Sequence, residues 1–317
     1  MILYIFILVV SMGLLVLSGK WLIEAMERIG MCFKLKEFVL AFFVIGIGAT
    51  IPNVVIGIVS ALNGIPELSL GDVMGSNIFD LTIVIGLAAL ISRGGISANS
   101  KTVQGSAFFV MINALLPLIL IFDHTLSRSD GVLLLLSFAI YNIWLFSKKD
   151  RFTKVYDDCP KNFFPLGIFK DFSIIFLGLI LLFIGGYGIV TSATFFYEEF
   201  NLPLGLMGIF VVAIGTCLPE TFFSLQAAKK GKDWMLLGNQ MGNVAITSTL
   251  ILGIVSLIQP IVIKDFSPFA VARIFLVIAA GMFVFSLRTN KKITKKEGYM
   301  LIGVYVIFLI VEIIVSR

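Results

Sequence analysis

Polar residues recur at regular spacing inside two long apolar stretches of the sequence. Each set is spaced i, i+4, i+8, and residues at that spacing stack along one face of a helix. The two sets are Asp72, Ser76 and Asp80 in the first stretch, and Asn239, Asn243 and Thr247 in the second. Carboxylate, amide and hydroxyl groups are thereby lined up on two helix faces.

A Gly/Pro-interrupted segment precedes each set. Asn53 follows Pro52 in the first segment, and Glu220 follows Pro219 in the second. Proline removes a backbone donor, and unpaired backbone at membrane depth is tolerated only where protein or a water-filled cavity satisfies it. Freed carbonyls and oxygen-bearing side chains are the ligands that hard cations prefer. The predicted metal-ion ligands are Thr50, Asn53, Ser76, Asp80, Thr216, Glu220, Asn243 and Thr247.

Charged side chains inside apolar segments are costly and are functional candidates by default. Asp80 and Glu220 are the first candidates for ion binding. Asp72 lies nearer the end of its segment, where an entrance or a hydrated cap competes with direct coordination. Glu24 and Glu312 lie near segment ends, and we interpret both as interfacial or structural.

The elements that carry these residues are transmembrane helices. Of the 317 residues, 59% are hydrophobic and 14% are charged, whereas soluble domains carry about 25% charged residues. The apolar runs are continuous and reach the ~20 residues that a helical span needs, unlike the short alternating strands of a barrel. The predicted fold is an all-α integral membrane protein with ten spans, at about 2–22, 37–62, 68–92, 104–122, 131–147, 172–197, 203–228, 234–259, 268–287 and 298–315.

The two halves of the chain repeat one pattern at an offset of 167 residues. Matched positions include Gly48 with Gly215, Pro52 with Pro219, Gly71 with Gly238, Gly75 with Gly242, and Gly86 with Gly253. A polar linker, 148–171, separates a first repeat, 1–147, from a second, 172–317, with five spans each. An odd span number inverts the second repeat relative to the first. We expect spans 2 and 7 to be broken at their Gly/Pro segments, and Gly75 and Gly242 to permit close helix packing.

Basic residues are distributed asymmetrically between alternate loops. One side of the predicted topology holds 19 Lys and Arg residues and the other holds 3. The positive-inside rule places both termini outside and the 148–171 loop in the cytoplasm. The basic pI therefore reflects topology and not nucleic acid; the expected partners are inorganic cations and the lipid bilayer.

Compact loops fit a prokaryotic inner membrane. No cofactor is expected, the oligomeric state is left open, and a monomer is compatible with the sequence. The three cysteines, Cys32, Cys159 and Cys217, do not predict a disulfide framework.

The paired motifs resemble those of the cation/calcium exchanger superfamily, which is best known for sodium/calcium exchangers. The resemblance covers essentially the whole chain and rests on Gly48–Asn53 with Gly71–Asn77, and on Gly215–Glu220 with Gly238–Asn243. It implies a secondary antiporter and not an enzyme. Sodium and calcium would bind at the bilayer midplane between spans 2, 3, 7 and 8, and would be exposed alternately to the two sides.

The chain departs from the family pattern at the ion site. The family usually places glutamate after each proline, where this chain has Asn53 and Glu220, and an acid or amide 27 residues further on, where it has Asp80 and Thr247. Ala49 and Cys217 also replace hydroxyl residues that the family uses around sodium. Fewer ligand charges predict weaker calcium binding, and on this basis Asn53→Glu is expected to tighten it.

Alternative functions remain open at this point. One is a proton-coupled or other-cation exchanger, in which Asp80 or Glu220 carries the proton. Another is a non-transporting, cation-binding paralogue. An intramembrane aspartyl protease is disfavoured, because its two carboxylates must meet to share a proton, whereas Asp72 and Asp80 are about 12 Å apart along one helix at 1.5 Å per residue.

Overall fold

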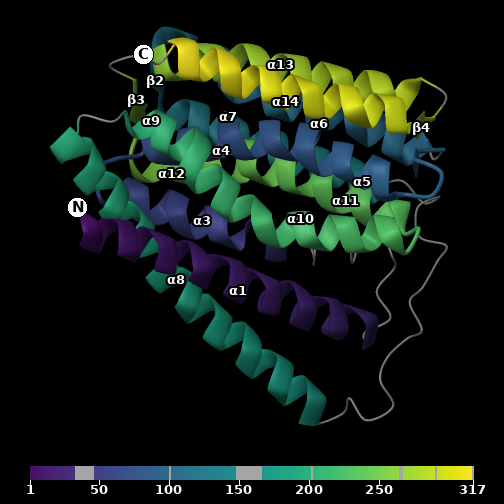
Figure 1. The fold of residues 1–317 in the computed structure, drawn as a ribbon, viewed down its shortest axis with the longest axis horizontal. Coiled ribbons are helices and arrows are strands. Elements are labelled where there is room, and N and C mark those ends of the chain that lie inside the picture. Colours follow the sequence, from purple (N-terminus) through teal and green to yellow (C-terminus); the bar gives the residue numbers. More distant parts are fainter. Residues whose placement is uncertain are drawn as a thin grey trace.

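The computed structural model describes residues 1–32, 46–99, 101–147, 166–200, 203–263, 267–289 and 291–315, and helices dominate it (Figure 1). The first half contains α1 (Ile2–Cys32), α3 (Gly46–Leu62), α4 (Glu67–Phe79), α5 (Ile85–Ile91), α6 (Lys101–Leu120) and α7 (Arg128–Ser147). The second half contains α8 (Leu166–Phe200), α9 (Leu204–Leu206), α10 (Ala213–Lys229), α11 (Asp233–Ala245), α12 (Leu252–Ile258), α13 (Ser267–Arg288) and α14 (Lys295–Val315). A short 3₁₀ turn, η3 (Ile121–Asp123), follows α6.

The prediction of a ten-helix membrane protein is confirmed. Within the described residues, eight continuous helical segments are long and apolar enough to cross a membrane, and Gly48–Leu62 is a shorter apolar helix. The helix α7 completes the set. The start of the predicted second span, 37–45, and most of the predicted linker, 148–165, lie outside the described residues. The helix α8 begins at Leu166, inside the stretch that the sequence assigned to the linker.

The Gly/Pro segments do not break their helices within the described residues. The helix α3 continues through Pro52, and α10 continues through Pro219. Irregularity takes the form of π-helical turns instead: η2 (Asp80–Val84) joins α4 to α5, η5 (Met207–Val212) precedes α10, and η6 (Ile246–Ile251) joins α11 to α12. The prolines still lack an N–H group, so the carbonyls four residues earlier lose their usual donors.

Two sets of contacts display the repeat in three dimensions. Gly86 packs against Gly298, where an added Cβ on Gly86 would lie 2.9 Å from the Gly298 oxygen. Gly253 packs in the same way against Gly131: an added Cβ on Gly253 would lie 3.0 Å from the Gly131 oxygen. Each of these four glycines has its counterpart 167 residues away in the other contact. The interface between α5 and α14 is therefore reproduced between α12 and α7.

Two short antiparallel strand pairs follow the same symmetry. The strand β1 (Ile96–Ser97) pairs with β4 (Lys292–Ile293), and β2 (Thr125–Leu126) pairs with β3 (Ile261–Val262). The strands β2 and β3 lie at the end of the bundle that holds both termini, whereas β4 lies at the opposite end (Figure 1). Equivalent elements at opposite ends are what an inverted repeat produces.

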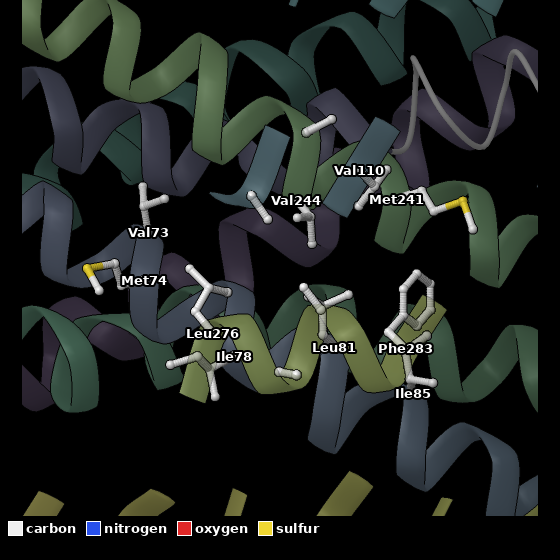
Figure 2. Close-up of a cluster of buried hydrophobic side chains, with 14 of the residues drawn as sticks. Val73, Met74, Ile78, Leu81, Ile85, Val110, Met241, Val244, Leu276 and Phe283 are labelled. Atoms are coloured by element: carbon white, nitrogen blue, oxygen red, sulfur yellow. The ribbon is translucent and has the colours of Figure 1, made fainter. Parts of the chain in front are cut away.

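The helices form an enclosed centre and a peripheral pair. In the most apolar stretches of Glu67–Ile91 and Asp233–Ile258, 72% and 78% of the residues are buried, whereas the shares are 22% for Ile2–Met26 and 33% for Gly167–Phe200. Apolar side chains on α4, η2, α11 and α13, including Ile78, Leu81, Val244 and Leu276, fill the core around the central segments (Figure 2). The peripheral pair, α1 with α8, lies along one side of the bundle (Figure 1).

Candidate cation site

The eight predicted ligands all lie in the interior, on α3, α4, η2, α10, α11 and η6. The exposed fraction of each side chain is 1% or less. These residues are Thr50, Asn53, Ser76, Asp80, Thr216, Glu220, Asn243 and Thr247. Residues from the two halves of the chain are therefore brought to the centre of the bundle.

The centre of the cluster is a pair of buried carboxyl groups. Ligand atoms of Asp80, Cys217 and Glu220 all lie within 4.8 Å of one another. Asn243 donates a hydrogen bond from Nδ2 to Asp80 Oδ2. Among the described residues, Asp80 Oδ1 and both oxygens of Glu220 have no hydrogen-bond partner.

No basic side chain neutralises this pair within the described part of the chain. The ion pairs found there are Lys20–Glu24 on α1 and Arg28–Asp171 between α1 and α8, away from the cluster. Burying an uncompensated charge costs several kcal/mol, and two like charges at this distance repel. Asp80 and Glu220 therefore need a cation or a proton between them.

A second group of contacts surrounds Asp72, which the sequence placed near the end of its span. The structure places it in the interior, with an exposed fraction of 0%, so a hydrated cap does not describe it. Asn53 donates from Nδ2 to Asp72 Oδ2 at 3.0 Å, and Thr216 donates from Oγ1 to Asp72 Oδ1 at 3.0 Å. Asp72 thus contacts two predicted ligands, and its position opposite Asn239 in the repeat was the signal available in the sequence.

A third group links α4 to η6. Thr247 donates to Asn77 Oδ1 at 2.8 Å, and Asn77 Nδ2 donates to Ser248 Oγ at 2.7 Å. Thr247 is therefore engaged with Asn77, a residue that the spacing argument did not select. The Ser76 hydroxyl group donates to its own helix, at Val73 O, 3.2 Å away.

Glycines allow the helices of the cluster to approach closely. A Cβ on Gly75 would lie 2.7 Å from Ile209 Cα, and a Cβ on Gly208 would lie 2.7 Å from the Asp72 nitrogen. The prediction that Gly75 permits close packing is confirmed. This crossing of α4 over η5 sets the distance between Asp72 and the start of α10.

A pocket of about 310 Å³ lies between α1 and α10. Its lining includes Lys20 and Glu24 on α1, and Pro219 and Gln226 on α10. Pro219 immediately precedes Glu220. Glu24 is half exposed and paired with Lys20, in keeping with a structural role, whereas Glu312 on α14 is buried, with Oε2 lacking a hydrogen-bond partner among the described residues.

Comparison with known proteins connects this arrangement to a family. The profile of the family described as "Sodium/calcium exchanger protein" matches residues 3–147 and 170–314. The inner membrane protein YrbG of Escherichia coli is 24% identical over 96% of this chain and 94% of its own length. The sodium/calcium exchanger MaX1 of Methanosarcina acetivorans is 24% identical over 96% of this chain and 97% of its own.

A solved structure has the same fold. The sodium–calcium exchanger NCX_Mj, soaked with 2.5 mM Na⁺ and 1 mM Sr²⁺, superposes with a TM-score of 0.69 at 26% identity and covers 98% of both chains. With both halves of the sequence matched by the family profile and the whole bundle matched by NCX_Mj, the chain belongs to the sodium/calcium exchanger family and is an integral membrane cation antiporter.

Proposed function

We propose that the protein exchanges sodium for calcium through the cluster between α3, α4–η2, α10 and α11–η6. The observation that carries this proposal is the set of fully buried, unpaired oxygens: Asp80 Oδ1, Asn243 Oδ1, Asn53 Oδ1 and both oxygens of Glu220. A buried acceptor without a donor is costly. A cation that accepts all of these oxygens as ligands removes that cost.

The ligand types favour hard cations. Calcium takes six to eight oxygens from carboxylates, amides, carbonyls and water. The two carboxylates of Asp80 and Glu220 balance one divalent ion, and the amide oxygens of Asn53 and Asn243 extend the coordination. Sodium, also a hard cation, competes for the same oxygens, and competition for a shared site couples the two fluxes.

Alternating exposure requires that some helices move relative to the site. The α1–α8 pair lies along one side of the bundle (Figure 1), and α1 meets the prolines of α10 and α3 at Gly19. We assign the moving part to this pair. The pocket next to Pro219 is then the approach to the site from the α10 C-terminal end.

Calcium-45 uptake into proteoliposomes tests the proposal. Vesicles loaded with sodium should take up calcium when sodium is diluted outside, and uptake should fall to background in Glu220→Ala and Asp80→Ala. Asp123→Ala, which removes an exposed carboxylate at the end of η3, is the matched control and should keep wild-type uptake. Calcium uptake that ignores the sodium gradient would refute sodium coupling.

Proton-coupled exchange is the second candidate. It is favoured by the proximity of Asp80 and Glu220, since two carboxyl groups this close can share one proton when no metal ion is bound. Calcium uptake driven by a pH gradient in vesicles free of sodium, and lost in Glu220→Ala, would establish it in place of sodium exchange.

A further inference from the structure

The two repeats carry an acid and an amide at matched positions, but in opposite order. In the second repeat the acid follows the proline, as Glu220, and the amide lies on the next helix, as Asn239. In the first repeat the amide follows the proline, as Asn53, and the acid lies on the next helix, as Asp72. Both pairs are related by the same 167-residue offset.

We propose that Asp72 supplies the negative charge that position 53 lacks, so that Asn53 and Asp72 act as one cation-binding unit. The site then holds three carboxylates, Asp72, Asp80 and Glu220. This inference rests on the proposed cation exchange at the same cluster. It raises the number of carboxylate charges that bound cations or protons must neutralise from two to three.

Direct contact between the two side chains supports the pairing. Asn53 Nδ2 donates to Asp72 Oδ2 at 3.0 Å, and it also lies 3.1 Å from Thr216 Oγ1. An amide side chain directs its nitrogen and oxygen to opposite sides. Because the nitrogen is turned toward Asp72, Asn53 Oδ1 is directed away from it, and this oxygen is buried without a hydrogen-bond partner among the described residues.

The Asp72 unit is continuous with the centre of the site. Thr216, which donates to Asp72, precedes Cys217, whose thiol lies in the group formed with Asp80 and Glu220. Asp72, Asp80 and Glu220 therefore surround two consecutive residues of α10, Thr216 and Cys217. Since no described Lys or Arg forms an ion pair with any of them, bound cations or protons must balance three charges and not two.

Asp72 also joins α3, α4 and α10 through its hydrogen bonds, and loss of those bonds alone could disturb the fold. A charge-exchange series separates the two roles. Asp72→Asn removes the charge. Asn53→Glu places a second carboxylate against Asp72 and removes the amide that donates to it. The double variant again has one carboxylate facing one amide, with the carboxylate now at position 53 and the amide at position 72. Asp123→Asn is the control, because Asp123 is exposed at the end of η3.

The purified full chain is titrated with calcium and, separately, sodium, and the thermal unfolding midpoint gives an apparent affinity. Removing a buried charged ligand is expected to weaken binding at least about tenfold. Asp72→Asn and Asn53→Glu should each show this loss, and the double variant should return to within about threefold of the wild type. The same contact reverses the earlier expectation that Asn53→Glu alone tightens calcium binding.

Each other result contradicts the inference. Unchanged cation affinity in Asp72→Asn would make Asp72 structural only. Loss in the single variants without recovery in a double variant that elutes as a single monodisperse peak would refute the pairing with Asn53. If neither calcium nor sodium stabilises the wild type, the proposed sodium/calcium exchange is refuted, independently of the pairing of Asn53 with Asp72. The same four variants are then titrated with potassium, with manganese and with protons. If none of these changes the thermal unfolding midpoint, the inference is overturned as well.

Discussion

Cys217 is the member of the central group whose chemistry fits a hard cation least. Its thiol is buried beside Asp80 and Glu220 and points toward the Ser76 carbonyl, 3.8 Å away. Thiols prefer soft metals, whereas sodium and calcium prefer oxygen. The thiol therefore occupies a ligand position at the site without supplying a ligand suited to either ion.

Cys217→Ser is expected to improve sodium binding. The hydroxyl group is a better ligand for sodium and fills a similar volume. An added polar contact of about 1 kcal/mol corresponds to a roughly fivefold gain in affinity. Sodium competition against calcium-45 uptake measures it, with Cys217→Ala as the control that removes the thiol without adding oxygen. Equal sodium affinity in the serine and alanine variants would show that position 217 does not face sodium.

At this scale the sequence predicted the burial of the eight candidate ligands, but it did not predict the burial of Asp72 or which side chains meet. The i, i+4 spacing was sufficient to select Asp80, Asn243 and Thr247, because helix faces follow from spacing alone. The contacts of Asp72 with Thr216, and of Asn77 with Thr247, depend on how α4 crosses η5 and η6. Such crossings are set by side-chain packing between segments more than 100 residues apart, which local spacing does not encode.

At the scale of helices, most predicted span ends agree with the structure to within a few residues, but α1 continues to Cys32, beyond the predicted end at 22, and α8 begins at Leu166, before the predicted start at 172. Hydropathy determines where a helix enters and leaves the apolar layer. Hydropathy does not determine the hydrogen-bond pattern inside a span, and the π-helical turns η2, η5 and η6 were therefore not predicted. The expected breaks were placed from the local cost of glycine and proline in the segments around Pro52 and Pro219, whereas neighbouring helices stabilise a continuous helix in both cases.

The contact of α1 with both prolines predicts a transport defect. A Cβ on Gly19 would lie 2.9 Å from Pro219 Cγ and 3.7 Å from Pro52 Cγ. Gly19→Leu should push α1 away from α3 and α10, at a cost typical of overpacking, about 1–3 kcal/mol. If α1 moves against these helices, calcium uptake should slow several-fold while calcium-induced thermal stabilisation persists.

The matched control is Gly13→Leu on the same helix. Nothing lies within 4 Å of a Cβ added to Gly13, so this variant should transport at the wild-type rate. An equal loss of uptake in both variants would indicate a general effect of leucine on α1, and a wild-type rate in Gly19→Leu would refute the assignment of α1 to the moving part.

At the scale of the whole molecule, the structure displays the inverted repeat, whereas the end of the bundle that faces the cytoplasm is a prediction. Both termini lie at one end of the bundle (Figure 1), and the charge distribution places that end outside. Cys32, at the opposite end of α1, is disulfide-bonded, which the sequence did not predict. Disulfides are rare in the cytosol, so this bond argues for the reverse orientation.

We expect the charge asymmetry to prevail, because the excess of 19 basic residues over 3 is spread over all the loops, whereas the disulfide concerns one position. Single cysteines at Ser129 and Lys230, both exposed and near opposite ends of the bundle, test this in a background with the three native cysteines replaced by alanine. A membrane-impermeant maleimide added to intact cells should label Ser129→Cys, and should label Lys230→Cys only after permeabilisation. The reverse pattern would place the termini and the α6–α7 turn in the cytoplasm. It would also put Cys32 outside, in a compartment where disulfides are common.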